Sequence, residues 1–199
     1  MLRTGLSSKC RQLRLTSERI VALWQATSLS VGFTEAMIFS LLTIWGLDVG
    51  LDETGTLRLL TTCIIGGVIL QLLFGFVANK VGRQRLLGLI GLTMVAASIS
   101  LPISAGAAIF AAAFVTGGLV LALYGLSLTL LGERFQPEQL AIASATFLIL
   151  YQLGSMVGPV ASGGAMDWKG TWGLTAALAL AGLVVATVAL FSRHAPSSN

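Results

Sequence analysis

The chain has 199 residues, of which 55% are hydrophobic and only 10% are charged, and its mean hydropathy is +0.89. Soluble domains carry about a quarter charged residues, so this composition excludes an ordinary soluble domain. Apolar runs long enough to span a bilayer indicate an all-α integral membrane protein instead. The formal net charge of +4 does not indicate nucleic-acid binding, because the cations gather at the ends of the apolar runs.

The residue types present give no indication of catalytic or metal chemistry. Of the two cysteines, Cys10 lies in a basic leader and Cys63 in an apolar run, which predicts neither a disulfide framework nor a metal site. The single histidine, His194, lies in the polar tail. Because the sequence shows no catalytic constellation and no phosphate-binding loop, we predict neither an enzyme nor a bound cofactor.

Residues 1–19 form a basic segment in which lysine and arginine outnumber the single acid, Glu18. Arginine-rich leaders with few acids are typical of organelle transit peptides. A basic segment beside the cytoplasmic face of a membrane has the same composition. We favour the cytoplasmic segment, which makes residues 20–191 the transmembrane domain.

The first membrane helix is predicted over residues 20–47. Trp24 and Trp45 lie near its two ends, where interfacial aromatic residues are expected. They are about 31 Å apart along a helix, which is close to the thickness of the hydrocarbon core. Glu35 falls almost midway between them and is the acidic residue that we place deep in the membrane.

Five more membrane helices follow. Polar turns separate them at Asp48–Arg58, at Pro102 with Gly106, at Gly132–Glu138 and at Asp167–Lys169. A short tail over residues 192–199 completes the chain. The predicted spans are about 57–78, 86–101, 107–131, 140–165 and 172–191.

The distribution of lysine and arginine predicts the orientation. With both termini in the cytoplasm, only Arg58 and Lys169 of the twelve cations lie outside. Cytoplasmic loops carry the excess of Lys and Arg, so the opposite orientation is disfavoured. The cytoplasmic cations are then Arg3, Lys9, Arg11, Arg14, Arg19, Lys80, Arg83, Arg85, Arg134 and Arg193.

The stretch between the second and third helices carries a family resemblance. Its sequence, Gly75–Arg85, resembles the signature loop of the major facilitator superfamily, roughly G-x-x-x-D-[RK]-x-G-R-[RK]. The family's Asp is replaced by Asn79, an amide that can hydrogen-bond but supplies no charge to the cytoplasmic gate. An ordinary basic loop is the alternative interpretation. The positions that match are Gly75, Lys80, Gly82 and Arg83, with Arg85 keeping the basic character one position late.

The resemblance implies a fold and an incomplete transport unit. Six helices match the C-terminal half of such a transporter, built from two inverted three-helix repeats. Alternating access needs a second wall, which a homodimer or a separate six-helix partner would provide. The chain is alternatively a fragment of a longer transporter.

Glu35 is the first candidate for transport chemistry. A carboxyl at mid-bilayer faces the bundle interior or a water-filled cavity, and desolvation favours its neutral form. Such a group can take up and release protons as its exposure changes. Gly32–Glu35 also resembles the corresponding helix of a bacterial drug-transporter-like branch. The alternative is a protonated glutamate with a purely structural hydrogen bond.

Glycines of the fifth helix are the second candidate. Gly154 and Gly158 form a small-x-x-x-small pair that lets two helices approach closely, and Pro159 removes a backbone donor. With Gly163 and Gly164, this run resembles the G-P-x-x-G-G element of superfamily antiporters, which favours efflux by antiport. A bending point for alternating access and simple helix packing are both consistent with it.

The remaining polar groups within helices are Gln71, Tyr124, Tyr151 and Gln152. They are predicted either to line a substrate path or to form interhelical hydrogen bonds. Together these features predict a proton-coupled transporter of a small organic or drug-like solute in the inner or plasma membrane. A non-transporting accessory or assembly subunit of the same fold is the alternative.

Overall fold

The computed structural model describes the backbone of residues 2–192 and the side chains of residues 24–133 and 135–191. The side chains of the predicted basic segment 1–19 and the predicted tail from residue 193 lie outside these ranges, as do Cys10 and His194. The described chain is helical throughout, with short connections. Its helices are α1 (Leu2–Asp48), α2 (Glu53–Val81), α3 (Arg83–Ile103), α4 (Ala107–Arg134), α5 (Pro137–Lys169) and α6 (Thr171–Ser192).

Six helices within the described residues are long and apolar enough to cross a membrane. The shortest membrane-length segments, in α3 and α6, have 21 residues. That length corresponds to about 31 Å, which matches a hydrocarbon core. The expected six-helix, all-α membrane fold is therefore confirmed, whereas the orientation of the termini stays a prediction.

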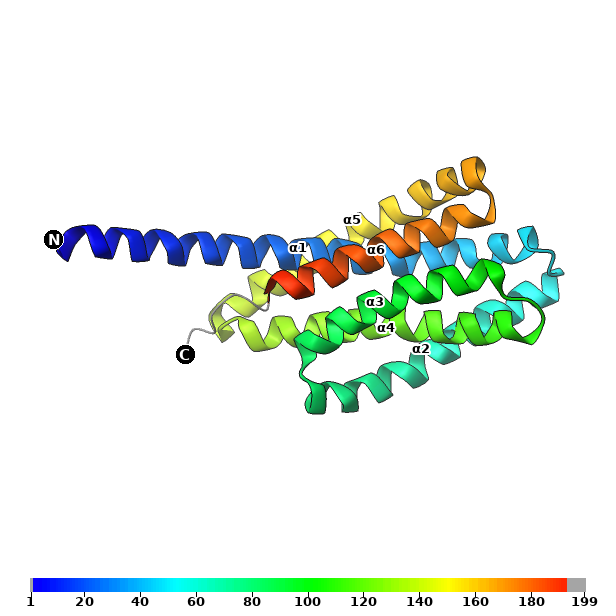
Figure 1. Cartoon of the computed structure of the whole chain (residues 1–199), viewed down its shortest axis with the longest axis horizontal. Coiled ribbons are helices and arrows are strands. Elements are labelled where there is room, and N and C mark those ends of the chain that lie inside the picture. Colours follow the sequence, from blue (N-terminus) through cyan, green and yellow to red (C-terminus); the bar gives the residue numbers. More distant parts are fainter. Residues whose placement is uncertain (1, 193–199) are drawn as a thin grey trace.

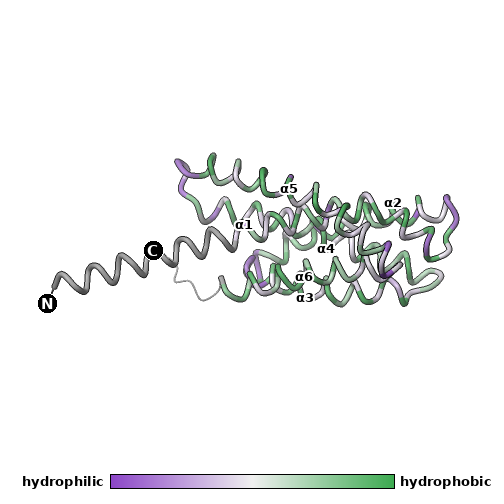
Figure 2. Tube along the Cα trace, turned by 90° about the horizontal axis from the view of Figure 1, so that it is seen from above, coloured by the Kyte–Doolittle hydropathy of each residue, from purple (hydrophilic) through white to green (hydrophobic). Residues whose placement is uncertain are grey.

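The helices continue several residues past most of the predicted spans, so the connections are short. Pro102 lies inside the last turn of α3, and Asp167–Lys169 belongs to α5 rather than to a turn. A single glycine links α2 to α3 and α5 to α6, namely Gly82 with φ +90° and Gly170 with φ +60°. This φ range favours glycine, because a Cβ would clash with the backbone there. Figure 2 shows hydrophilic positions where the chain turns from one helix into the next.

The helices pack in three close pairs, α1 with α5, α2 with α4, and α3 with α6 (Figure 1). If α1, α2 and α3 are exchanged with α4, α5 and α6 respectively, the α1–α5 pair becomes the α4–α2 pair. The α3–α6 pair is unchanged. This is the pairing that two three-helix repeats produce. Helices α1 and α4 therefore occupy equivalent places, as do α2 and α5.

Glycines at equivalent places allow the two crossing pairs to touch at the backbone. A Cβ built on Gly66 of α2 would lie 2.1 Å from the carbonyl oxygen of Phe114 in α4. One built on Gly154 of α5 would lie 2.1 Å from the carbonyl oxygen of Leu29 in α1. Gly154 follows Gly66 by the same number of positions that separates Gly170 from Gly82. The repeats thus share a register as well as a pairing.

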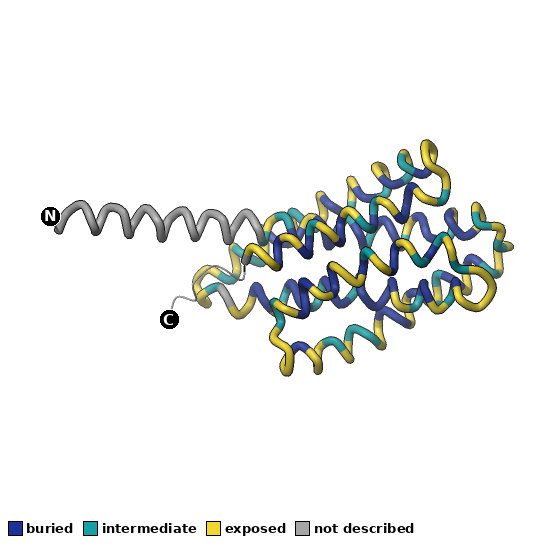
Figure 3. Tube along the Cα trace, viewed as in Figure 1, coloured by how far each residue is buried: buried dark blue, intermediate teal, exposed yellow. Residues whose placement is uncertain are grey.

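Helices α2 and α5 are the most exposed members of the bundle (Figure 3). Their outward apolar side chains include Leu72 and Phe76 on α2, and Met156 and Val160 on α5. By contrast, Trp45 at the end of α1 is fully buried, and its indole Nε1 donates to the carbonyl oxygen of Thr171 at 2.9 Å. That bond joins α1 to the start of α6.

Candidate functional site

Glu35 lies half-buried on α1, and the Tyr151 side chain of α5 reaches its carboxyl group. The second carboxyl oxygen, Oε2, is buried and has no hydrogen-bond partner within the described part of the chain. A buried polar atom without a partner carries a desolvation cost that a proton or a ligand can remove. Glu35 is therefore a group with unused binding capacity in the middle of a membrane helix.

Aromatic rings extend from this carboxyl into α4 and α5. Tyr124 packs edge-to-face on Tyr151 with ring centroids 5.5 Å apart, and on Phe147 with centroids 6.2 Å apart. Both distances lie in the favourable range for aromatic pairs. Glu35, Tyr151, Tyr124 and Phe147 therefore form one continuous group, which we call the carboxyl–aromatic cluster.

The close approach of α1 and α5 places Tyr151 beside Glu35. A Cβ on Gly32 would lie 1.9 Å from the Tyr151 carbonyl oxygen, so a side chain there would force the helices apart. Ser155 Oγ donates to the carbonyl oxygens of Tyr151 at 3.0 Å and Gly32 at 3.3 Å. The second of these bonds ties the two helices together within one turn of the carboxyl.

The predicted helix-bending glycines divide into two groups. Gly154 and Gly158 are buried against the backbone of α1, where a Cβ on Gly158 would lie 2.5 Å from the Phe33 carbonyl oxygen. Gly163 and Gly164 have nothing within 4 Å of a built Cβ. Close helix packing therefore accounts for the first pair alone, while α5 continues as one helix through Pro159.

The other predicted polar residues, Gln71 and Gln152, are not members of the cluster. Gln71 of α2 places its Nε2 3.0 Å from a Cβ built on Gly125, so its amide lies against α4. Gln152 is exposed on α5. Of the predicted substrate-path residues, the structure thus brings together Glu35, Tyr124 and Tyr151.

A cavity of about 350 Å³ opens beside the cluster, between α1, α4 and the start of α5. It lies at the end of the bundle where α2 turns into α3 and α4 into α5, which we call the signature end. Phe147 belongs both to the cavity wall and to the cluster. The other lining residues are Trp24, Gln25, Ser28, Leu131, Phe135, Gln139, Ile142, Ala143, Thr146 and Leu150.

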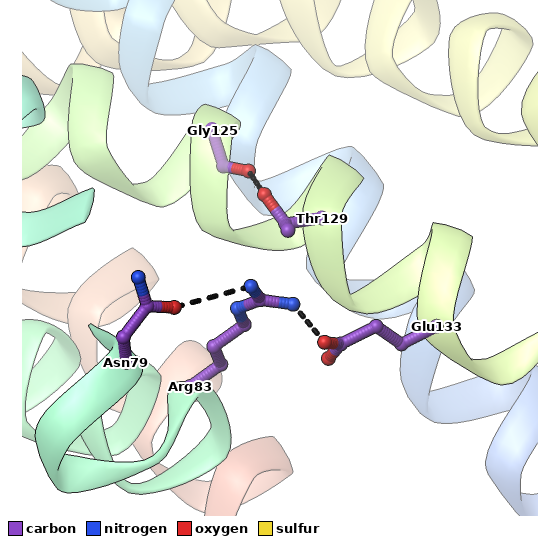
Figure 4. Close-up of polar contacts among 5 residues, drawn as sticks. All are labelled: Asn79, Arg83, Gly125, Thr129 and Glu133. Atoms are coloured by element: carbon purple, nitrogen blue, oxygen red, sulfur yellow. Dashed lines mark hydrogen bonds and ion pairs between the residues drawn. The ribbon is translucent and has the colours of Figure 1, made fainter. Parts of the chain in front are cut away.

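The signature loop lies at the same end. Arg83 forms an ion pair with Glu133 at the end of α4, and its Nη2 donates to Asn79 Oδ1 at 3.3 Å (Figure 4). A cavity of about 770 Å³ beside this pair is lined by these three residues, with Gln84 and Arg85 among the others. Lys80 is exposed and outside that lining. Asn79 thus accepts a hydrogen bond from Arg83, and the same guanidinium pairs with the carboxylate of Glu133.

Sequence reasoning placed Glu133 in a loop and gave Phe147 and Ser155 no role. Glu133 has a readable signal, because an acid at the end of a membrane helix can pair with a basic loop at the same surface. Phe147 and Ser155 have none, since a phenylalanine or serine in a membrane helix is ordinary. Within the described residues no group of His, Cys, Asp and Glu is arranged to hold a metal ion.

Comparisons with known proteins agree with this geometry. Within residues 26–199 the chain matches the sequence profile of the Major Facilitator Superfamily. It is 26% identical over 137 residues to the uncharacterized MFS-type transporter YfkF of Bacillus subtilis (strain 168). That match covers 66% of this chain but 34% of the relative, so the matched segment spans about a third of that protein.

Solved transporters share the fold. The POT family transporter PepTSo superposes with a TM-score of 0.78 at 15% identity, over 91% of this chain and 39% of that one. An auto-inhibited POT family peptide transporter gives a TM-score of 0.74 at 13% identity, with the same coverage. The helix pairing, the signature loop and the profile match lead to one conclusion: this chain belongs to the Major Facilitator Superfamily of membrane transporters.

Proposed function

We propose that the chain forms one wall of a transport pathway for a small organic solute, and that Glu35 couples this transport to protons. The observation that carries the proposal is the buried, unpartnered Oε2 of Glu35 beside Tyr151, in the middle of a membrane helix. Ionisable residues inside membrane segments mark ion and proton pathways by default. A carboxyl with an unused oxygen can exchange its proton when the pathway opens to water.

A change in the surroundings of Glu35 is the physical basis of coupling. When the carboxyl is shielded from water its neutral form is favoured, and when water reaches it the ionised form is favoured. Tyr151 and Tyr124 connect the carboxyl to Phe147, which borders the 350 Å³ cavity. Solute in that cavity and a proton on Glu35 would then influence each other through shared contacts, and this influence is reciprocal.

The second wall of the pathway comes from another six-helix unit, either a second copy of the chain or a different one. In the family two such halves face each other around a site near the bilayer midplane. The native mass of the complex extracted from the inner or plasma membrane tests this directly. A two-unit complex supports transport by this chain, whereas a lone six-helix unit contradicts it and favours an accessory subunit or a fragment of a longer transporter.

The replacement Glu35→Gln tests the coupling. We expect it to abolish pH-gradient-driven solute flux while the protein stays folded, because glutamine keeps the shape of the side chain but cannot bind a transferable proton. The complex is reconstituted in vesicles under an imposed pH gradient, and proton movement is followed with an entrapped pH-sensitive dye. Neutral, cationic and anionic aromatic solutes are supplied in turn.

Glu53→Gln is the matched control, because it makes the same change at an exposed position at the start of α2. It is expected to leave the flux and its pH dependence unchanged. If Glu35→Gln vesicles kept the wild-type pH dependence, Glu35 would have no part in coupling.

A further inference from the structure

We propose that the 350 Å³ cavity between α1, α4 and α5 binds an uncharged solute that carries an aromatic ring and a hydrogen-bonding group. This inference rests on the proposed transport function, and it names the class of substrate. It is drawn from the chemistry of the lining, whose described side chains are aromatic, aliphatic, hydroxyl and amide, with no charged one among them.

The absence of charge among the described lining side chains disfavours ions. An ionised group in a cavity without a counter-charge loses its hydration and gains no partner in return. Glu35 is not among the described lining residues, and the contacts of Tyr151 and Tyr124 link it to Phe147 in the cavity wall. The other cavity at the signature end has the opposite character, with Arg83, Arg85 and Glu133 in its wall.

Polar groups of the lining can satisfy a neutral solute. Ser28 Oγ donates to the Trp24 carbonyl oxygen at 2.8 Å, and Thr146 Oγ1 donates to the Ile142 carbonyl oxygen at 2.9 Å. Because each hydroxyl already donates its proton to a backbone carbonyl, its oxygen can accept a hydrogen bond from a solute hydroxyl or amide. The amide side chains of Gln25 and Gln139 add donors and acceptors.

Aromatic side chains of the lining favour a ring. Trp24, Phe135 and Phe147 come from α1, the α4–α5 connection and α5, so rings border the cavity from separate elements. Flat rings pack on such surfaces in stacked or edge-to-face contacts. A volume of about 350 Å³ lies at the small end of the range of ligand sites, which suits a solute of one or two rings.

Three probes of equal shape test the charge selectivity. They are naphthalene-1-methanol, 1-naphthylmethylammonium and 1-naphthoate, which share one ring system and are neutral, cationic and anionic at pH 7. Equilibrium binding of each radiolabelled probe is measured to the full chain in lipid nanodiscs, with empty nanodiscs subtracted. We expect the neutral probe to bind at least about tenfold more tightly than either ion, since tenfold corresponds to a modest difference in free energy. Equal binding of all three, or preference for an ion, would overturn the inference.

The replacement Gln139→Glu locates the site. A carboxylate in the lining is expected to raise the affinity for the ammonium probe about tenfold and to weaken naphthoate binding further. Gln136→Glu is the matched control, because it makes the same change three positions away at an exposed residue outside the lining. If the two variants changed ammonium binding equally, general surface charge would explain the effect and the cavity would not be the site.

Binding without a gradient separates this inference from the proposed function. Selective neutral binding that responds to Gln139→Glu supports the cavity even if no flux is found, in which case the transport proposal alone fails. Flux of charged solutes through a cavity that binds no neutral probe contradicts the inference and leaves transport standing.

Discussion

Two joints that occupy equivalent places in the two repeats are built from opposite kinds of chemistry. Trp45 near the end of α1 bonds the Thr171 carbonyl at the start of α6, and Glu133 near the end of α4 pairs with Arg83 at the start of α3. The same number of positions separates Trp45 from Glu133 and Arg83 from Thr171. One joint is a fully buried indole, whereas the other is an ion pair with its side chains 28% and 52% exposed.

This difference assigns different roles to the two ends of the bundle. A buried joint is held by apolar burial and packing, which act continuously and do not respond to ions. An exposed ion pair contributes little free energy and can open at small cost. Both cavities described above border the signature end, where the weaker joint lies. The repeats therefore share a backbone register. Their different side chains make the joint at the signature end the one that opens more easily.

Removing the buried joint is the largest expected effect. Trp45→Ala should lower the free energy of unfolding by about 3–5 kcal/mol, because it leaves a cavity in the core and removes the indole hydrogen bond to the Thr171 carbonyl. Denaturant-induced unfolding in mixed micelles measures the loss. Trp168→Ala is the control, since that ring is 80% exposed and has the Lys169 ammonium over it at the surface. Its cost should stay below about 1 kcal/mol, and equal losses would show that burial does not distinguish the two tryptophans.

Glycine replacements test the register that the repeats share. Gly66→Ala and Gly154→Ala should each cost about 1–3 kcal/mol, because each added Cβ meets a backbone oxygen of the partner helix. The equivalent pair Gly75→Ala and Gly163→Ala should be neutral or stabilising by up to about 1 kcal/mol, since nothing lies within 4 Å and alanine favours helix. Unfolding of the four variants in one micelle system provides the comparison. Unequal costs within either pair would break the proposed equivalence.

The exposed joint should show the smallest effect on stability and the clearest dependence on salt. A double-mutant cycle with Arg83→Ala and Glu133→Ala should give a coupling below about 1 kcal/mol, which falls further at 1 M salt as the charges are screened. The cost of Trp45→Ala should not change with salt. Arg85→Ala, which removes the same charge from the same helix start, controls for net charge. A salt-independent coupling would mean that the pair is held by packing rather than by charge.

The sequence predicted those features for which a residue pattern allows only one backbone conformation. The apolar runs give six membrane helices, because a chain in hydrocarbon must satisfy its own backbone hydrogen bonds. Gly82 marks a break, since its φ of +90° is disfavoured for residues with a Cβ. The helix ends were less predictable. Polar residues such as Asp167 and Lys169 are tolerated in a helix that extends into the membrane surface, so polarity alone does not place the turn.

The sequence by itself determined the membrane fold, the family signature and Glu35 as the acid within a span. Only the tertiary structure decided which residues meet. It placed Tyr151 on Glu35, set Phe147 between the cavity and the tyrosines, and joined Arg83 to Glu133. The physical reason is that helix formation is a local property of an apolar run, whereas these contacts depend on how glycine-lined helices cross. Residues far apart in the chain become neighbours only at those crossings.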